Sequence, residues 1–321
     1  MDCEWCPVCG SGSQIIESLP AKATKDRIGK LLGDISVAAL EFPDYFVREC
    51  NNCSLVFAAP MTPGDASFYS WLTTREGYYT DARWEWQEVR SIVAKELPGR
   101  TELLLADIGC GSGLFLKSLP PVRGCRYVGI DSSPETVAAC RLEGLEVHQG
   151  DWGLLASLFP AGLDVVTAFH CLEHLPDPVG FVKDCVKQLR PGGRLYVSTP
   201  FYPSSTEEQW SDPLNAPPHH LTRWNMKAYQ ALAEAVECKA RVHLPPAEGL
   251  LSRTVRSYRF VLSFPYASIG VSRKRRILST ALGIMLHPYE ALTLFARQVK
   301  RQRIDGKVAP DVILVEIERP A

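Results

Sequence analysis

The stretch LLLADIGCGSG, residues 103–113, decides how this chain of 321 residues can fold. An apolar run ends at Asp107, and Gly109, Gly111 and Gly113 follow at every second position, before a helix-like run. Glycine lets the backbone turn sharply and approach a ligand closely. The free N–H groups at the start of a helix attract electronegative ligand groups. The pattern therefore predicts a strand, a tight turn and a helix, with a candidate ligand site at the turn.

Similar apolar runs recur along the chain and alternate with helix-like segments. We expect further strands at 126–131, 145–151, 164–170 and 193–200, with two more candidates at 239–245 and 311–319. Pro134 and Pro178 stand where two intervening helices would begin, a position that tolerates the missing N–H of proline. Short apolar strands that alternate with helices predict an α/β protein, with a parallel sheet covered by helices on both faces.

Acidic residues follow two of the expected strands. Asp131 ends the second run, where a carboxylate can accept hydrogen bonds from both hydroxyls of a ribose. Asp151 follows the third run and precedes Trp152, so the acid could accept a hydrogen bond from an adenine amino group beside the indole ring. The spacing G-x-G-x-G differs from the G-x-G-x-x-G of dinucleotide-binding folds. A tight turn at the glycines and a helix N-cap at each aspartate are the plain structural alternatives.

These motifs resemble those of the class I S-adenosylmethionine-dependent methyltransferases. ADIGCGSG, GIDSSP and QGDW are similar to the first three motifs of that family. HCLEHLPDP (170–178) and LRPGGRLYVSTP (189–200) are similar to later segments in the branch that includes ubiquinone-type and sugar methyltransferases. The resemblance covers about residues 75–248 and the last strand, and it implies a Rossmann-like methyltransferase sheet of seven strands.

The resemblance also implies which residues contact the cofactor. Asp107, Gly109 and Gly111 would contact the methionine part of S-adenosylmethionine, whereas Asp131 would bind the ribose and Asp151 the adenine. The full set of implied contacts is Asp107, Gly109, Cys110, Gly111, Gly113, Asp131, Ser132, Asp151, Trp152, His170 and Glu173. The last two of these residues would line the mouth of the active site.

Two close cysteine pairs lie near the N-terminus. The chain has 11 cysteines, and its first residues form no apolar leader, so we expect thiols in a reducing, cytoplasmic environment. Cys6, Cys9, Cys50 and Cys53 form a C-x2-C…C-x2-C pattern whose thiolates suit a closed, tetrahedral, structural Zn²⁺ site. Cys3 has the same spacing to Cys6 and is an alternative ligand. Some methyltransferases of sugars or glycan pathways carry a similar N-terminal zinc-ribbon-like module.

Two histidines follow the fifth expected strand. His219 and His220 lie in the segment PPHHLTRW, and similar loops border the acceptor pocket in the resembling branch, so either is a candidate general base. The alternative is that one of them only hydrogen-bonds the loop. Tyr79 belongs to an aromatic-rich stretch that would form either a lid over the site or a packing seam against the zinc module. With His170, these residues are the predicted catalytic candidates.

The charge of the chain is unevenly distributed. The net charge is −1, but residues 249–307 contain 12 Lys and Arg against two acids, a local net charge of +10. Basic amphipathic helices lie on anionic membranes, which would give peripheral membrane contact and suit a lipid-linked glycan acceptor. Nucleic acid is a less favoured partner, and a helical lid with a solvated basic face is the plain alternative.

The sequence thus divides into five segments. We expect a zinc-ribbon-like module (1–60), an aromatic helical linker (61–100), a methyltransferase core (101–248), a basic helical insertion (249–308) and a last core strand (309–321). The composition, with 46% hydrophobic and 22% charged residues, excludes a disordered or collagen-like chain. No apolar run reaches the roughly 18 residues of a transmembrane helix.

The expected function is methyl transfer from S-adenosylmethionine to a small-molecule, sugar or lipid-linked glycan acceptor. RNA or protein methylation guided by the basic insertion is one alternative, and a non-catalytic cofactor-binding scaffold is another. The segment HCLEH replaces the Asn/Asp-Pro-Pro-aromatic motif of many nitrogen-methylating enzymes, which argues against methylation of a base nitrogen. The sequence leaves the acceptor atom open.

Overall fold

The computed structural model describes most of the chain. The described residues are 4–32, 40–73, 83–96, 102–204, 213–246, 248–262, 282, 284–301, 303–304 and 306–320. Tyr79 and Cys3 of the sequence analysis lie outside these residues, and so does the part of the basic segment from 263 to 281.

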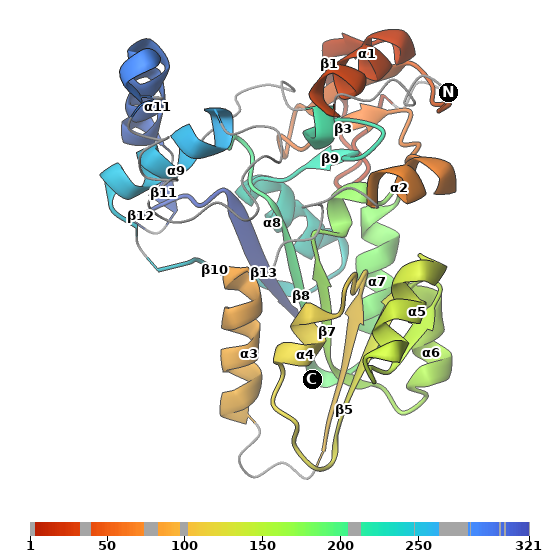
Figure 1. The fold of residues 1–321 in the computed structure, drawn as a ribbon. Coiled ribbons are helices and arrows are strands. Elements are labelled where there is room, and N and C mark those ends of the chain that lie inside the picture. Colours follow the sequence, from red (N-terminus) through yellow and green to blue (C-terminus); the bar gives the residue numbers. More distant parts are fainter. Residues whose placement is uncertain are drawn as a thin grey trace.

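The centre of the molecule is a seven-stranded sheet with the strand order β10-β13-β8-β7-β4-β5-β6 (Figure 1). Its strands are β4 (Leu103–Ile108), β5 (Cys125–Asp131), β6 (Val147–Gln149), β7 (Leu163–Phe169), β8 (Leu189–Pro200), β10 (Lys239–His243) and β13 (Val312–Glu318). The five strands β6, β5, β4, β7 and β8 run parallel to one another, whereas β13 is antiparallel to both of its neighbours. Each strand overlaps one of the expected apolar runs, so the α/β prediction with seven strands is confirmed.

Helices cover both faces of this sheet, as Figure 1 shows for α3 and α7 on opposite sides of the strands. They are α3 (Trp84–Glu96), α4 (Leu114–Ser118), α5 (Pro134–Leu142), α6 (Leu155–Leu158), α7 (Pro178–Gln188) and α8 (Met226–Ala235). One apolar cluster joins α3, α4 and α5 to Val165 of β7, and another joins α6, α7 and α8 to Val166. Successive residues of a strand point to opposite faces, so β7 contributes to both clusters.

Two of these helices begin as the sequence predicts. Pro134 opens α5 behind Ser133, whose hydroxyl accepts a hydrogen bond from the Thr136 N–H. Pro178 opens α7 behind Asp177, whose carboxylate accepts one from the Gly180 N–H. A proline in the first turn loses no hydrogen bond there, and the preceding cap satisfies a backbone donor.

A second, smaller sheet has the order β1-β2-β3-β9 and is antiparallel throughout. Its strands are β1 (Ser13–Leu19), β2 (Tyr45–Cys50), β3 (Val56–Ala59) and β9 (Thr222–Arg223), with α1 (Ala21–Leu32) and α2 (Ala66–Thr73) nearby in the sequence. The edge strand β9 comes from the segment after β8, far from the other three strands in sequence. The N-terminal sheet is therefore completed by the part of the chain that carries His219 and His220.

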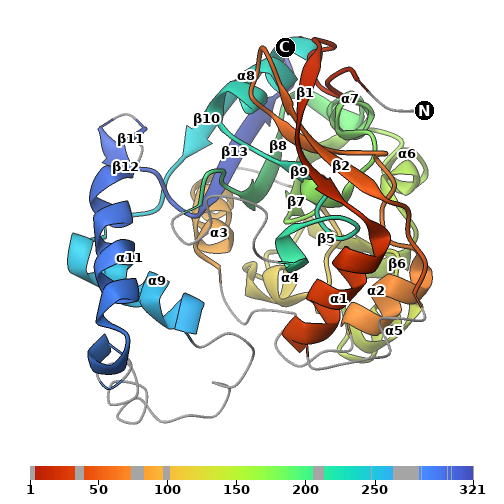
Figure 2. The ribbon, with the colours of Figure 1, turned by 90° about the horizontal axis from the view of Figure 1, so that it is seen from above.

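The expected helical insertion lies between β10 and β13. It contains α9 (Leu250–Leu262) and α11 (Pro288–Lys300), followed by the short pair β11 (Arg303–Ile304) and β12 (Lys307–Val308). Figures 1 and 2 both show α9 and α11 side by side at one margin of the molecule. Among the described residues, no helix combines the length and apolar character needed to cross a bilayer.

Candidate cofactor and acceptor site

The glycine loop follows β4 directly and has the backbone conformation that the sequence predicts. Gly109, Gly111 and Gly113 have φ angles of 67°, 51° and 69°, in the left-handed region that favours glycine. A Cβ on Gly113 would stand 2.3 Å from Cδ1 of Leu145, so this position also needs the space that glycine leaves. The loop is held to β5 by the Gly109 N–H, which donates to the Ile130 carbonyl over 2.8 Å.

Asp131, at the end of β5, holds the loop from the other side. Its Oδ2 accepts a hydrogen bond from the Gly111 N–H (2.9 Å) and its Oδ1 accepts one from the Ser133 N–H (3.0 Å). A carboxylate offers about four lone-pair sites, so each oxygen can still accept from a ligand hydroxyl. Burial raises the pKa of this carboxyl group. The next residue, Ser132, is exposed.

Asp107 lies beneath the loop at the end of β4, where it is buried. The Thr167 hydroxyl donates a hydrogen bond to its Oδ1 over 2.7 Å. Burial raises the pKa of Asp107 to about 7. Cys110 is also buried, and its Sγ lies 2.7 Å from the point that a Cβ on Gly129 would occupy. Cys110 therefore fills the space between the loop and β5, and a cofactor contact for either residue stays a prediction.

The third predicted motif forms a capped turn. Asp151 is exposed and its Oδ1 accepts a hydrogen bond from the Gly153 N–H (2.8 Å), so it is the N-cap of a short 3₁₀ helix. Trp152 donates from Nε1 to Oδ2 of Asp184 (3.2 Å), and its ring meets Phe181 edge-on. Asp151 is thus a helix N-cap, which was the structural alternative for this residue. The contact of Asp151 and Trp152 with adenine stays a prediction.

His170 follows β7 and is held between two buried carboxylates. Its backbone is left-handed (φ 52°), which is uncommon for a residue with a side chain. Its Nε2 lies 3.0 Å from Oε1 of Glu85, and its Nδ1 lies 3.3 Å from Oε1 of Glu173. Burial and the charge of Arg83 act to lower the pKa of His170, but the hydrogen bonds to Glu173 and Glu85 outweigh them and raise it. The two glutamates therefore favour the protonated form of His170.

The histidine cluster, which we define as His174, His219 and His220, lies next to this group. The ring centroid of His174 lies 4.4 Å from that of His219 and 4.8 Å from that of His220. Nδ1 of His174 lies 2.6 Å from the His219 carbonyl, and Nδ1 of His220 lies 2.6 Å from Oδ1 of Asn215. Both partners accept, so each Nδ1 carries a proton.

Burial keeps the pKa values of His219 and His220 well below the usual range. Their rings are therefore neutral and can accept a proton or a hydrogen bond. The ligand atoms of the three histidines lie within 4.8 Å of one another, close enough to hold a divalent metal ion as well. Tyr69 of α2 borders the cluster, with its ring centroid 5.9 Å from that of His219.

Backbone hydrogen bonds fix this cluster from two sides. The Leu221 N–H donates to the Glu173 carbonyl over 2.7 Å, which joins the His219–His220 loop to the segment after β7. The Ala58 N–H of β3 donates to the Leu221 carbonyl over 2.8 Å. The side chain of Asn225 donates from Nδ2 to the Ser54 carbonyl over 2.6 Å. The N-terminal sheet thus holds the loop that carries two of the predicted catalytic residues.

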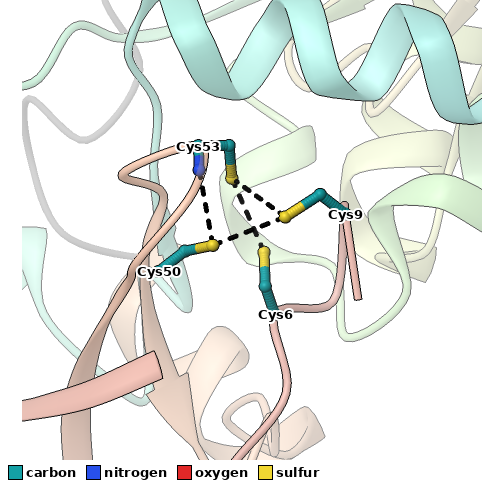
Figure 3. A group of neighbouring side chains, drawn as sticks. All are labelled: Cys6, Cys9, Cys50 and Cys53. Atoms are coloured by element: carbon teal, nitrogen blue, oxygen red, sulfur yellow. Dashed lines mark hydrogen bonds between the residues drawn. The ribbon is translucent and has the colours of Figure 1, made fainter. Parts of the chain in front are cut away.

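The four predicted zinc ligands converge at one point, as Figure 3 shows. Sγ of Cys9 lies 3.4 Å from Sγ of Cys50 and 3.7 Å from Sγ of Cys53, and Sγ of Cys6 lies 3.7 Å from Sγ of Cys53. Four sulfurs around a tetrahedral Zn²⁺, each about 2.3 Å from it, would lie about 3.8 Å apart. The donor set therefore fits the ion in type, number and spacing.

The two cysteine pairs have the same local backbone structure. The first cysteine of each pair donates its N–H to the carbonyl five residues on, from Cys6 to Ser11 (2.8 Å) and from Cys50 to Leu55 (2.9 Å). The residue after each pair, Gly10 or Ser54, is left-handed, with φ of 67° or 55°. The N–H groups of Val8 and Asn52 point at the sulfurs of Cys6 and Cys50 (3.4 Å each). Such repeated turns are what a closed metal site needs to aim its ligands.

Sequence reasoning missed two residues of the site. His174 belongs to the quoted segment HCLEHLPDP, and its spacing of four residues from His170 was the available signal. Glu85 gave no signal, because it reaches His170 only through the packing of α3 on the sheet. Tyr79 lies outside the described residues, so its predicted role stays untested.

Comparison with known proteins agrees with this geometry. Residues 106–197 match the family described as "Methyltransferase domain". The match and the strand order identify a class I S-adenosylmethionine-dependent methyltransferase domain in this chain. The Ubiquinone biosynthesis O-methyltransferase of Idiomarina loihiensis is 40% identical over 99 residues, which are 29% of this chain and 40% of that protein. The Xanthomonas campestris protein of that name is 38% identical over 109 residues, 32% of this chain and 44% of that protein.

The chain thus spans less than half the length of these curated relatives. Among solved structures, an S-adenosylmethionine-dependent methyltransferase from Archaeoglobus fulgidus is 17% identical, with a TM-score of 0.45, over 79% of this chain and 100% of that one. A plantazolicin methyltransferase in complex with S-adenosylhomocysteine is 12% identical, with a TM-score of 0.48, over 79% of this chain and 91% of that one. The fold assignment rests on the strand order rather than on these likenesses.

Proposed function

We propose that this protein transfers a methyl group from S-adenosylmethionine to a small-molecule acceptor. The observation that carries the proposal is the arrangement at the carboxyl ends of β4 and β5. Three left-handed glycines lie there beside Asp131, whose carboxylate fixes the loop and retains lone pairs for a ligand. The strand order reverses at β4, between β5 and β7, and open α/β sheets bind their ligands at such a switch point.

The acceptor would lie on the side of the glycine loop that faces the histidines. Sγ of Cys171 lies 3.5 Å from the point that a Cβ on Gly109 would occupy, so the segment 170–174 borders the loop. Bound S-adenosylmethionine supplies an electrophilic methyl group, and an acceptor hydroxyl must lose its proton as the new bond forms. His219 and His220 are neutral imidazoles next to this segment, and either can take that proton or orient the hydroxyl.

The finer assignment of the acceptor rests on two likenesses. The relatives are named for O-methylation in ubiquinone biosynthesis, which favours an oxygen atom of a small molecule. The N-terminal cysteine module resembles that of methyltransferases in sugar and glycan pathways, which favours a sugar or lipid-linked glycan. We infer an oxygen acceptor on a molecule of one of these kinds.

The cysteine cluster would hold a structural zinc ion. Four thiolates close the coordination of the metal and leave no position for a substrate, so the ion would stabilise the module rather than react. The described cysteines form no disulfide bonds, and we place the protein in the cytoplasm, where cysteines stay reduced.

Cofactor binding is the first test of the proposal. Calorimetric titration with S-adenosylhomocysteine should give saturable binding, and Asp131→Ala should weaken it at least tenfold, because the variant loses both the loop tie and the ribose acceptor. Glu234→Ala, at an exposed position of α8, is the control and should bind like the wild type. Absence of binding to the wild-type protein would overturn the proposal.

Acceptor chemistry is the second test. Transfer of a tritiated methyl group should occur to a hydroxyl-bearing small molecule in a panel of phenols, sugars and glycolipids, and not to RNA or protein. With the acceptor found, His219→Ala and His220→Ala should lower kcat while S-adenosylhomocysteine binding is retained. Transfer only to RNA or protein would exclude a small-molecule acceptor, and full turnover in both variants would exclude these histidines as the base.

A further inference from the structure

Exposed apolar side chains gather on α11 and on the residues just before it. Met285, Leu286, Tyr289, Leu292 and Val299 expose 76%, 67%, 79%, 72% and 58% of their surface. Single exposed apolar residues are common on proteins, whereas a contiguous group marks a surface that contacts something else. The group therefore needs a partner that the described fold does not provide.

The orientation of α11 shows that this exposure is systematic. Its inner side packs on α9, with Leu294 and Gln298 only 3% and 1% exposed, and Nε2 of Gln298 donates to Oγ of Ser257 (2.8 Å). At about 100° per residue, Tyr289, Leu292 and Val299 fall within an arc of about 80° on the other side. A helix on a protein surface normally presents polar residues to water. Here the outward face carries apolar residues, in addition to Leu294 on the side that packs on α9.

Positive charge lies beside this outward face. Lys300 is exposed at the end of α11, Arg297 is half-buried one turn earlier, and Arg303 follows in β11 with its side chain exposed. These residues belong to the segment 249–307, whose net charge of +10 contrasts with −11 for the rest of the chain. Apolar side chains flanked by Lys and Arg are the composition of helices that lie in the interface of an anionic membrane.

We propose that the outward face of α11 docks on the surface of an anionic lipid bilayer. Tyr289, Leu292 and Val299 enter the boundary between headgroups and acyl chains, and the neighbouring basic residues contact lipid phosphates. The 13 residues of α11 span about 20 Å, short of the roughly 30 Å of a hydrocarbon core, so the helix lies along the membrane. Nucleic acid would use the charges and leave the apolar face in water, and this favours lipid as the partner.

Vesicle co-sedimentation with the full chain tests the proposal. The wild type should bind vesicles of phosphatidylcholine mixed with phosphatidylglycerol, bind phosphatidylcholine alone at least tenfold more weakly, and lose affinity as salt is raised. Leu292→Glu should lower binding at least tenfold, and Leu292→Ala should lower it several-fold without adding a charge. The control is Leu142→Glu on α5, where the wild-type leucine is 90% exposed, and this variant should bind like the wild type.

A second pair of variants tests the charge. Lys300→Glu should weaken binding to the anionic vesicles, whereas Lys22→Glu, at an exposed lysine of α1, should not. Thermal melts of all variants should match the wild type, because every changed side chain is exposed. The proposal is overturned if the wild type does not bind anionic vesicles at low salt, or if Leu142→Glu and Leu292→Glu lose vesicle binding equally. It is also overturned if the protein is a dimer that Leu292→Glu dissociates and that does not bind vesicles, or if the protein binds RNA in place of lipid.

Discussion

Asn225 connects the second cysteine pair to the histidine loop, and its replacement should show what that connection contributes. Its Oδ1 accepts a hydrogen bond from the Ala228 N–H (3.0 Å) as the N-cap of α8, while its Nδ2 donates to the Ser54 carbonyl (2.6 Å). Loss of an N-cap costs about 1 kcal/mol. Loss of a hydrogen bond of this kind costs about another 1 kcal/mol. Asn225→Ala should therefore lower the free energy of unfolding by about 2 kcal/mol.

Two further variants separate these contributions. Asn225→Ser keeps an N-cap but is too short to reach Ser54, so it should cost about 1 kcal/mol. Ser133→Ala removes the N-cap of α5, which has no link to the cysteine module, and should also cost about 1 kcal/mol. Urea denaturation measures all three free energies, and an unchanged slope against urea shows that the same unfolding is being compared.

Hydrogen exchange locates the effect of Asn225. The Ala58 amide joins β3 to the loop that carries His219 and His220, and the Leu221 amide joins that loop to Glu173. Both amides should exchange faster in Asn225→Ala and Asn225→Ser than in Ser133→Ala. The reasoning is refuted if Asn225→Ala costs no more than Ser133→Ala, or if exchange at these two amides is the same in every variant.

Three other perturbations have defined outcomes. The purified protein should contain one zinc ion per chain by mass spectrometry of the metal, and Cys53→Ser should lose it while Cys185→Ser, at a buried cysteine outside the cluster, should retain it. Gly113→Ala should destabilise the protein by more than Gly192→Ala. Both glycines are left-handed, but nothing lies within 4 Å of a Cβ on Gly192. Equal losses of stability in thermal melts would show that the space around Gly113 does not matter. The pKa of Asp107 rises from 3.8 to about 7 on folding, so the folded state binds more protons in that range and stability should fall as pH rises from about 4 to 7. Asp107→Asn should flatten this dependence, and an unchanged urea-midpoint profile would contradict the assignment.

The central sheet could be predicted because its signals are local. Each strand overlaps a short apolar run, and Pro134 and Pro178 are the first residues of α5 and α7. The spacing of the cysteines likewise identified the four residues that converge, since two residues between thiols let both face one point. Features of this kind depend on neighbours in sequence, and the fold preserves them.

The remaining features depend on contacts between distant segments. The outward face of α11 is periodic in the sequence, but periodicity does not say which side of a helix packs on α9. Glu85 meets His170 across 85 positions. The strand β9 has two residues, Thr222 and Arg223, which is too short for any alternation of polar and apolar side chains to be recognised. Its pairing with Val56 and Phe57 becomes visible only in three dimensions.

That pairing changes how the cysteine module is understood. As a separate N-terminal unit the module would only stabilise itself. Because β9 pairs with β3, the sheet of the module also supports the loop that carries His219 and His220. Cys53 is followed by Ser54, whose carbonyl holds Asn225, and β3 then pairs with the residues just after His220. A metal ion held by the four thiols would also restrain the start of β3, because Cys50 ends β2 and Cys53 lies in the turn that leads to β3. The position of the histidines would therefore depend on the proposed metal site, although no thiol needs to contact a substrate.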